Sequence, residues 1–304
     1  MRLIHFAGIA LIALVWGSSF LFIAVMLREM SPLAVAWLRL GGGAAVILGF
    51  AVFRRPEIPR SKRFWLDVTV LSVLASTLPF ILIPLGQREI SSGLAAILNS
   101  SVPIWAATFA FMLLPTERLS RARAFGLLVG FAGVAVVIGP DALAAGTAGV
   151  RGQIEVLLAS ACYGAGAVYF RRHLAGRDST FIAGTQSAIG FLLLTPIVLA
   201  VGDARGLAHV SAVAILAALG LALLSSGIAI IVYYWLLTEV TAAQATTSTY
   251  LLPITAMFWG WSLLGEQVRW TVLPGLVLVL AGVWLINRPA KESRRVLGRL
   301  RSQP

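Results

Sequence analysis

Polar side chains stand in the middle of two long apolar stretches of this sequence, where their chemistry suits solute binding. Asn99 and Ser100 precede one proline, and Thr249 and Tyr250 precede another. Amide and hydroxyl groups can bind a polar solute inside a membrane without the free-energy cost of a buried charge. The alternative is that they hold helices together, since Ser and Thr commonly hydrogen-bond across membrane helices. We expect the cluster as a whole to line a cavity.

The two prolines, Pro103 and Pro253, lie near the middle of their apolar stretches. Proline removes one backbone hydrogen bond and bends a helix. Asn99 and Thr249 each precede their proline by four residues, so each shares a helix face with it. We predict that the prolines are hinges for alternating access. The alternative is a pair of packing kinks without motion.

Two aromatic residues and one arginine complete the set of candidate binding residues. Trp16 and Tyr163 lie too deep for the aromatic belts at membrane surfaces, so they either contact a solute or pack in the core. Arg39 is the only basic residue well inside an apolar stretch. It could attract a substrate carboxylate, snorkel to the interface or bond helix ends. The predicted substrate-binding residues are Trp16, Arg39, Asn99, Ser100, Tyr163, Thr249 and Tyr250.

Catalytic and metal-binding patterns are missing from the apolar stretches. An embedded enzyme needs a nucleophile with a base, a metal cluster or paired carboxylates. The chain has one cysteine and three histidines that are far apart in sequence. Asp67 and Glu155 stand near the ends of their stretches, so neither is placed at mid-depth as a proton relay. We therefore expect no enzyme activity, no cofactor and no metal.

The elements that position these residues are membrane helices. The 304 residues are 59% hydrophobic and 12% charged, which excludes a soluble globular protein. A helix needs about 20 apolar residues to cross the hydrocarbon core. Ten stretches are predicted to cross, with short connections: Phe6–Leu27, Leu33–Phe53, Trp65–Pro84, Ser92–Leu114, Ala122–Gly139, Gly152–Phe170, Phe181–Val201, Ser211–Leu236, Thr241–Leu264 and Thr271–Asn287. A cleaved signal peptide is the alternative for the first stretch, but its uncharged run is long and lacks a clear cleavage site.

The basic residues separate by membrane side. With the N-terminus in the cytoplasm, 18 of the 24 Lys and Arg residues fall inside and five outside. This bias predicts a multi-pass membrane protein with both termini in the cytoplasm. It also explains the net charge of +12 without nucleic acid as a partner. The expected partners are a small-molecule substrate and the lipid bilayer, and the sequence does not indicate an oligomeric state.

An internal repeat relates the first five stretches to the last five. The matches, at offsets of 147 to 150 residues, are Trp16 with Tyr163, Gly17 with Gly164, Arg39 with Gln186, Glu89 with Glu239, Pro103 with Pro253, Glu117 with Glu266, Gly126 with Gly275, and Gly133 with Gly282. Five crossings are an odd number, so the second copy enters the membrane from the opposite side. We predict an all-α membrane protein of two inverted five-helix repeats, residues 1–145 and 146–290, and a basic cytoplasmic tail, residues 291–304. Helices five and ten, with their glycines, are expected to form a scaffold outside the cavity.

The motifs also carry a family resemblance. They are WGSSF at Trp16–Phe20, Pro32 with Arg39, SGLAAILNSSVP at Ser92–Pro103, and GLLVGFAGVAVV at Gly126–Val137. With them the chain resembles the drug/metabolite transporter superfamily, in its ten-helix EamA-type branch, from Phe6 to about Asn287. The resemblance implies an inner-membrane carrier, often an exporter of amino acids, metabolites or drugs.

These observations favour a secondary transporter that exports small organic solutes such as amino acids, by alternating access near the midplane. The alternatives are a channel, a non-transporting membrane assembly subunit, or an importer of a vitamin- or nucleoside-type metabolite.

Overall fold

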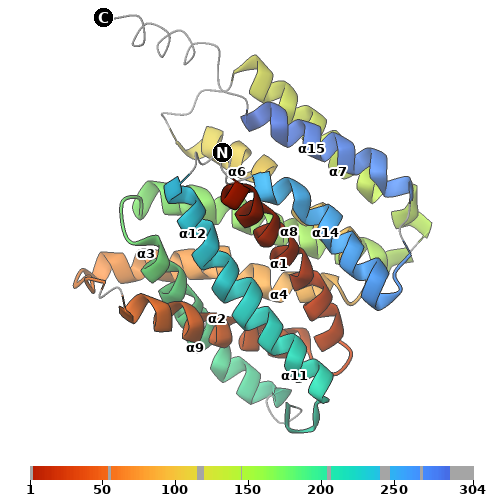
Figure 1. Ribbon diagram of the computed structural model, residues 1–304. Coiled ribbons are helices and arrows are strands. Elements are labelled where there is room, and N and C mark those ends of the chain that lie inside the picture. Colours follow the sequence, from red (N-terminus) through yellow and green to blue (C-terminus); the bar gives the residue numbers. More distant parts are fainter. Residues whose placement is uncertain are drawn as a thin grey trace, which may run out of the picture.

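The computed structural model describes residues 3–53, 56–114, 120–144, 146–203, 207–239, 247–267 and 270–287, and every regular element in these ranges is a helix (Figure 1). The elements are α1 (Leu3–Met26), α2 (Pro32–Phe53), α3 (Lys62–Ser72), η1 (Val73–Thr77), α4 (Leu78–Gly86), α5 (Ser92–Asn99), α6 (Val102–Leu113), α7 (Arg121–Ala144), α8 (Gly146–His173), α9 (Ser179–Val201), η2 (Leu207–His209), α11 (Ala212–Leu219), η3 (Gly220–Ile228), α12 (Ala229–Glu239), α14 (Thr247–Leu264), η4 (Trp270–Val272) and α15 (Leu273–Asn287).

Nine helical stretches within the described ranges are long and apolar enough to cross a membrane, and α14 is a tenth helix of 18 residues. The expected all-helical fold with ten spans is confirmed. Large apolar side chains that are 64% to 69% exposed occur on α7, α9, α11 and α15, as expected for lipid contact; they are Leu128, Leu192, Leu216 and Val277. The predicted start of the ninth span, Glu117 and the tail 291–304 lie outside the described residues.

The helices define two ends of the molecule. The start of α1 and the end of α15 lie at the same end of the molecule (Figure 1), which we call the terminal end. The opposite end, which we call the distal end, carries the turns after α1, α4 and α9 and the turn between α14 and η4.

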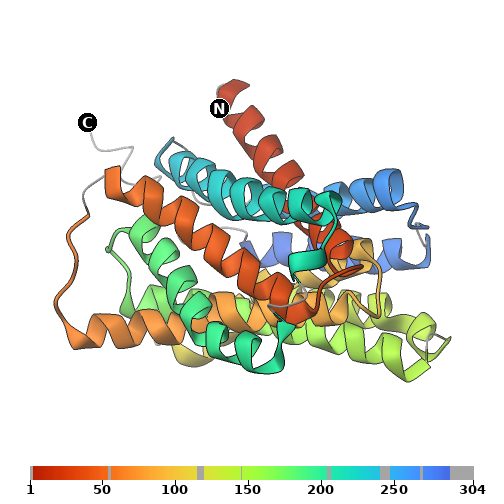
Figure 2. The same cartoon turned by 90° about the horizontal axis from the view of Figure 1, so that it is seen from below.

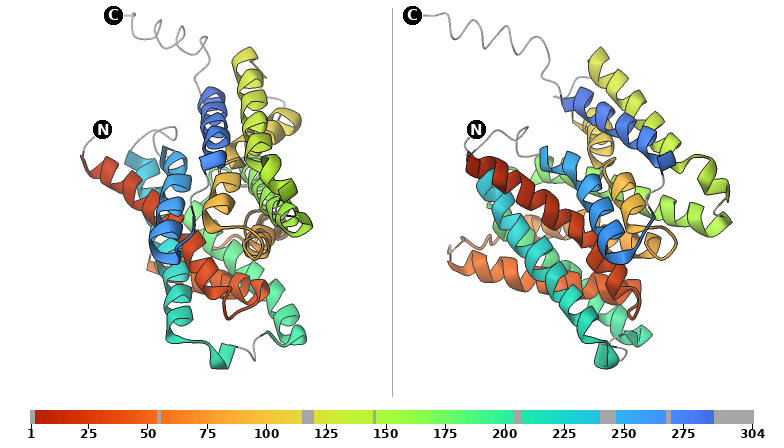
Figure 3. Two further views of the ribbon diagram at one scale, coloured as in Figure 1. Left: turned by 90° about the vertical axis from the view of Figure 1, so that its right-hand side faces the viewer. Right: turned by 45° about the vertical axis from the view of Figure 1, so that its right-hand side comes forward.

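The packing of the helices follows a pseudo-two-fold axis. The second spans of the two halves, α2 and α9, pack against each other, and so do the fifth spans, α7 and α15 (Figure 1). The first span, α1, packs against α14 and against α11, η3 and α12. Its mate, by which we mean the equivalent element of the other repeat, is α8. This helix packs in the same way against α5 and α6 and against η1 and α4. Figure 2 shows α11 and η3 beside α2, and Figure 3 shows α1 beside α12. Exchanging the two halves leaves these contacts unchanged, which fits two inverted five-helix repeats.

Two equivalent glycines show how closely this symmetry holds. A Cβ on Gly17 of α1 would lie 2.9 Å from the backbone nitrogen of Ala256 in α14. A Cβ on its mate Gly164 in α8 would lie 2.7 Å from the backbone nitrogen of Ala106 in α6. Ala106 and Ala256 are themselves repeat mates, at an offset of 150. Each glycine therefore allows the first span of its half to touch the fourth span of the other half.

The glycines of the fifth spans are also reciprocal. A Cβ on Gly133 would lie 2.9 Å from the carbonyl oxygen of Gly275, and a Cβ on Gly275 would lie 2.9 Å from that of Gly133. The span in α7 ends at Gly139, where a φ of +38° breaks the helix. These glycines therefore let the fifth and tenth spans pack closely against each other.

The apolar core is unevenly distributed between the two ends. One cluster of buried residues joins nine of the ten spans in the distal half, from Phe20 and Ile23 of α1 to Leu276 of α15. Toward the terminal end the described residues form separate clusters instead. One joins α3, α8 and α9 around Val68, and another joins α1 and α12 around Ile12. Among the described residues, the apolar cluster that joins the most spans therefore lies in the distal half.

Two carboxylates add contacts across the halves at the distal end. Glu266 accepts hydrogen bonds from the backbone N–H (2.9 Å) and hydroxyl (2.8 Å) of Ser92, at the start of α5. Glu29 accepts hydrogen bonds from the backbone N–H (2.6 Å) and hydroxyl (2.5 Å) of Ser211, just before α11. Carboxylates stabilise helix N-termini by accepting unpaired N–H donors and by opposing the helix dipole. We call these two caps and the distal apolar cluster the distal seal.

Candidate functional site

A cavity of about 410 Å³ lies between the two halves, near the middle of the spans. Its walls come from both halves: Trp16, Ser19, Phe20, Ile23, Arg39, Ala75, Ser76, Phe80, Ile83, Asn99, Ser100, Val102, Pro103, Tyr163, Ala183, Gln186, Ser187, Ser225, Ser226, Ile230, Thr249 and Leu252. The structure thus brings together six of the seven predicted binding residues and one of the two predicted hinges. Tyr250 and Pro253 are not on the wall.

Residues at equivalent positions of the two repeats face this cavity. The pairs on the wall are Trp16 with Tyr163, Arg39 with Gln186, Ser76 with Ser225, and Asn99 with Thr249. A pseudo-two-fold axis brings mates together only where it passes between them. The cavity therefore lies on the axis that relates the halves.

Two π-helical segments, η1 and η3, occur at equivalent positions in the third and eighth spans. They bring Ser76, Ser225 and Ser226 to the wall. The carbonyl oxygen of Ser225 accepts a hydrogen bond from the indole Nε1 of Trp16 at 3.2 Å. Local π-helix is rare and often marks a functional site. The sequence analysis missed these serines, although a match at an offset of 149 within the repeat was a usable signal.

The two proline positions differ in backbone structure. The fourth span is interrupted at Ser100 and Ser101, between α5 and α6. Their hydroxyls donate to the carbonyl oxygens of Ile97 and Leu98, both at 2.6 Å, in competition with the helical pattern. In the second half Tyr250 and Leu251 stand at these positions, and α14 continues through Pro253. The predicted pair of matching bends is thus one break and one continuous helix.

The polar clusters before the prolines reach the cavity through Asn99 and Ser100 in the first half and through Thr249 in the second half. Asn99 and Thr249 are on the wall, and the hydroxyl of Ser160 lies 3.5 Å from Oδ1 of Asn99. Tyr250 faces away from the cavity, and its hydroxyl accepts a hydrogen bond from Nδ2 of Asn287 at 2.9 Å. Neighbouring residues on a helix point about 100° apart, so Thr249 and Tyr250 cannot share a face.

Among the described residues of the wall, Arg39 is the only charged one. Its guanidinium lies over the ring of Phe80, with the guanidinium carbon 3.9 Å from the ring centre. Its Nε atom is buried and has no hydrogen-bond partner among the described residues. The only other such atom on this wall is the hydroxyl oxygen of Ser226.

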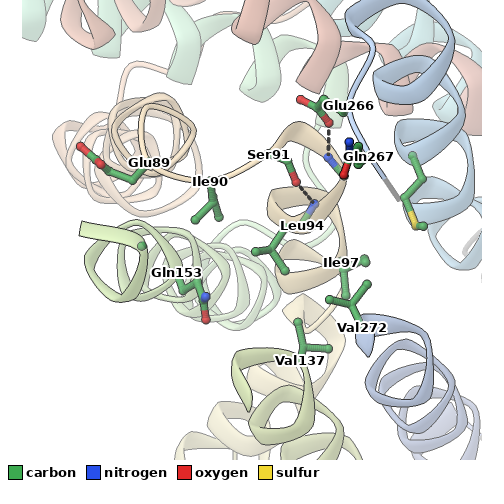
Figure 4. Close-up of a pocket in the computed structure, with 13 residues that line it drawn as sticks. Glu89, Ile90, Ser91, Leu94, Ile97, Val137, Gln153, Glu266, Gln267 and Val272 are labelled. Atoms are coloured by element: carbon green, nitrogen blue, oxygen red, sulfur yellow. Dashed lines mark hydrogen bonds between the residues drawn. The ribbon is translucent and has the colours of Figure 1, made fainter. Parts of the chain in front are cut away.

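A second pocket, of about 330 Å³, lies at the distal end between the start of α5 and the start of α8 (Figure 4). Glu266 lies beside α5 on one side, and Gln153 of α8 lies on the other. Glu266 already accepts two hydrogen bonds from Ser92. This pocket lies at the end of the spans and away from the axis, so we take the central cavity as the candidate site.

Comparison with known proteins gives the context of this cavity. The sequence profile of the EamA-like transporter family matches residues 4–139 and again residues 150–288. The chain is 23% identical over 278 residues to the uncharacterized transporter YoaV of Bacillus subtilis, covering 91% of this chain and 94% of that protein. It is 25% identical over 300 residues to the uncharacterized inner membrane transporter YedA of Escherichia coli, covering 94% and 93%. A crystal structure described only as that of a protein has a TM-score of 0.62 at 18% identity, covering 94% of this chain and 96% of that chain, and so shares the fold.

Proposed function

Because the chain belongs to the EamA-like transporter family and is a multi-pass membrane transporter, we propose that it is a secondary transporter that exports small organic solutes by alternating access. We expect the solutes to be amino acids or related metabolites. One observation carries the proposal: repeat mates from both halves face a single cavity at mid-depth. Inverted-repeat transporters bind their solutes in that position, where the halves meet.

The uneven packing of the two ends supports a conformation that is closed at the distal end and accessible from the terminal end. Among the described residues, one apolar cluster joins nine spans in the distal half, and the clusters toward the terminal end each join fewer spans. α14 packs against α5, the distal part of the fourth span, and so adds to the contact between the halves at the distal end.

The pseudo-symmetry suggests how access would change sides. If each half takes up the conformation that the other now has, the distal seal opens and an equivalent seal forms at the terminal end. The break at Ser100 and Ser101 provides a joint in the fourth span. Pro103 and Pro253 lack the N–H that would bond the carbonyls of Asn99 and Thr249. Both prolines are therefore proposed hinges, although Pro253 lies within a continuous helix.

We also propose that the terminal end is cytoplasmic, because most Lys and Arg residues fall on that side. The single native cysteine, Cys162, is replaced by serine, and cysteine is then introduced at Arg60 or at Asp203. A membrane-impermeant thiol reagent applied to intact cells should label position 203 and spare position 60. Labelling of both positions from the same side would refute the topology.

The transport proposal is tested by counterflow in proteoliposomes preloaded with unlabelled amino acids or organic acids. A carrier accumulates labelled solute transiently against the preloaded pool, and its exchange saturates with solute concentration. A channel gives neither result. Membrane vesicles of known orientation then distinguish export from import. Absence of saturable exchange across the whole panel would refute the proposed function.

A variant pair separates binding from helix packing. Asn99→Ala, on the cavity wall, should raise the half-saturating solute concentration while leaving the protein folded. Leu128→Ala, at a position that is 69% exposed on α7, is the control and should leave transport unchanged. If Asn99→Ala instead lowers the melting temperature and the surviving protein has normal kinetics, Asn99 only holds helices together.

A further inference from the structure

We propose that the solute of the central cavity carries a single carboxylate, which Arg39 and Ser226 bind on one wall, and an apolar or aromatic body. This inference rests on the proposed transport function and narrows its substrate class. It starts from the two unpartnered polar atoms on the wall, one from each half of the chain.

Arg39 and Ser226 lie on the same side of the cavity. Ser226 of η3 packs against Gly43 of α2, where a Cβ on the glycine would be 3.0 Å from the Cβ of Ser226. Gly43 follows Arg39 by four residues, so the two share a helix face about 6 Å apart along the axis. The guanidinium and the hydroxyl thus belong to a single stretch of wall, which we call the Arg39 wall.

The equivalent stretch on the other side carries no charge, and its hydroxyls are already engaged. Gly190, the mate of Gly43, lies against Thr77, the mate of Ser226. The hydroxyl of Ser72 lies 3.4 Å from that of Thr77 and donates to the backbone carbonyl of Gln186 at 2.6 Å. Gln186 is the mate of Arg39.

One substitution between the repeats explains why the Arg39 wall lacks an internal partner. At the position of Ser72 the second half has Leu221, which cannot hydrogen-bond. Ser226 consequently has no counterpart of the Ser72–Thr77 contact, and its hydroxyl oxygen is buried and unpaired. Of the two equivalent stretches of wall, the Arg39 wall is therefore the one whose described residues include two unpaired polar atoms, Nε of Arg39 and the hydroxyl oxygen of Ser226.

Buried donors without acceptors are unfavourable, and a charged donor more so. No Asp or Glu is among the described residues of the cavity wall, and a carboxylate on the solute can supply the missing acceptor. The planar guanidinium fits a carboxylate, and the hydroxyl can donate to a carboxylate oxygen. Phe80 covers one face of the guanidinium, which leaves its in-plane N–H groups for an anion.

The remaining wall indicates the rest of the solute. Trp16, Phe20 and Tyr163 offer aromatic surface, and a volume of about 410 Å³ suits a small organic molecule. A phosphate ester is less suitable than a carboxylate, because its charge of about −1.5 to −2 would exceed that of one arginine.

The test uses 3-phenylpropanoate, its neutral amide 3-phenylpropanamide, and phenyl phosphate. Their affinities for the purified full chain are measured by ligand-induced thermal stabilisation, and their transport by counterflow in proteoliposomes. The wild-type protein should bind the acid at least about tenfold more tightly than the amide, as expected for a charge-assisted hydrogen bond. Arg39→Gln, which installs the residue of the mate position, should remove this preference without weakening amide binding.

Three further variants sharpen the result. Ser226→Ala should reduce the acid preference about threefold, and Arg39→Lys should retain part of it. Arg88→Gln, the same exchange at an exposed distal arginine, should change nothing. If Arg39→Gln does not fold, the acid-to-amide ratio of the wild type and of Ser226→Ala decides the question.

Equal binding of acid and amide by the wild type would overturn the inference, as would an unchanged acid preference in Arg39→Gln or Ser226→Ala. Tighter binding of phenyl phosphate than of the acid would replace the carboxylate by a phosphate. Saturable counterflow of other solutes with no acid preference would refute only the inference. Acid-selective binding without any counterflow would refute only the transport function.

Discussion

The two halves of the chain have matching residues where they pack against each other and different residues where they face the cavity. Gly17 and Gly164 both bring a first span within backbone contact of the opposite fourth span. Arg39 and Gln186 also occupy equivalent positions, but one is charged and the other neutral. In alternating access the halves exchange conformations, which demands matched packing surfaces. Recognition of a solute makes no such demand, so asymmetry can concentrate at the wall.

The largest expected effect is on the matched packing. Gly17→Leu and Gly164→Leu should each prevent recovery of folded protein, because the new side chain collides with backbone atoms of the partner helix. Overpacking typically costs about 1–3 kcal/mol and more where the backbone has to move. The measurements are the monodisperse fraction in detergent and the melting temperature.

Gly49→Leu on α2 is the matched control, since no heavy atom lies within 4 Å of a Cβ there. It should fold like the wild type. Tolerance of leucine at Gly17 together with failure at Gly164, or the reverse, would mean that the halves are not equivalent in packing.

The next effect tests the difference between the walls. The double variant Arg39→Gln and Gln186→Arg moves the charge to the mate wall, where Ser72 already engages the hydroxyl of Thr77. Acid binding should return only in part, about threefold to tenfold weaker than in the wild type, since one hydrogen bond is worth roughly 0.5–1.5 kcal/mol. Titration with 3-phenylpropanoate measures it. Full recovery would show that the walls are interchangeable.

The sequence contained most of the framework. Long apolar stretches predict the ten helices, and the odd-numbered repeat predicts their inversion, because both signals depend on composition and register alone. The register also predicted that Trp16, Tyr163, Asn99 and Thr249 lie at a common depth, and all four are on the cavity wall.

The orientation of individual side chains was harder to predict. Thr247, Ser248, Thr249 and Tyr250 are consecutive polar residues, so hydropathy alone does not say which of them faces the axis. The structure turns Tyr250 toward Asn287 of α15. The unpaired hydroxyl of Ser226 depends on Leu221 one turn earlier and on the π-helical backbone of η3, which carries no recognisable sequence signal.

A smaller effect is expected at the distal seal. Glu266→Gln weakens the cap on α5 by removing the charge that its N–H groups and helix dipole favour, which is worth about 0.3–1 kcal/mol. Opening of the distal end should rise by about twofold to fivefold. With Cys162 replaced by serine and Ser19→Cys introduced in the cavity, the labelling rate from the distal side reports it.

Glu57→Gln, at an exposed position in the loop before α3, is the charge-matched control and should leave the labelling rate unchanged. An unchanged rate in Glu266→Gln would mean that the apolar cluster alone closes the distal end.

The smallest effect concerns pH at the second cap. Hydrogen bonds from the hydroxyl and backbone N–H of Ser211 lower the pKa of Glu29 below its ordinary value. A lowered pKa means that the cap is fully present above the ordinary pKa of a glutamate, about 4.3. The cap is lost only as the pH falls through the lowered value. Distal labelling should therefore not vary between about pH 5 and 8 on account of Glu29, and should rise only in more acidic solution. Glu29→Gln should label at a constant, slightly higher rate across this acidic range. A rise centred near neutral pH that disappears in Glu29→Gln would contradict the lowered pKa, because it would require the Ser211 contact to favour the protonated carboxyl group.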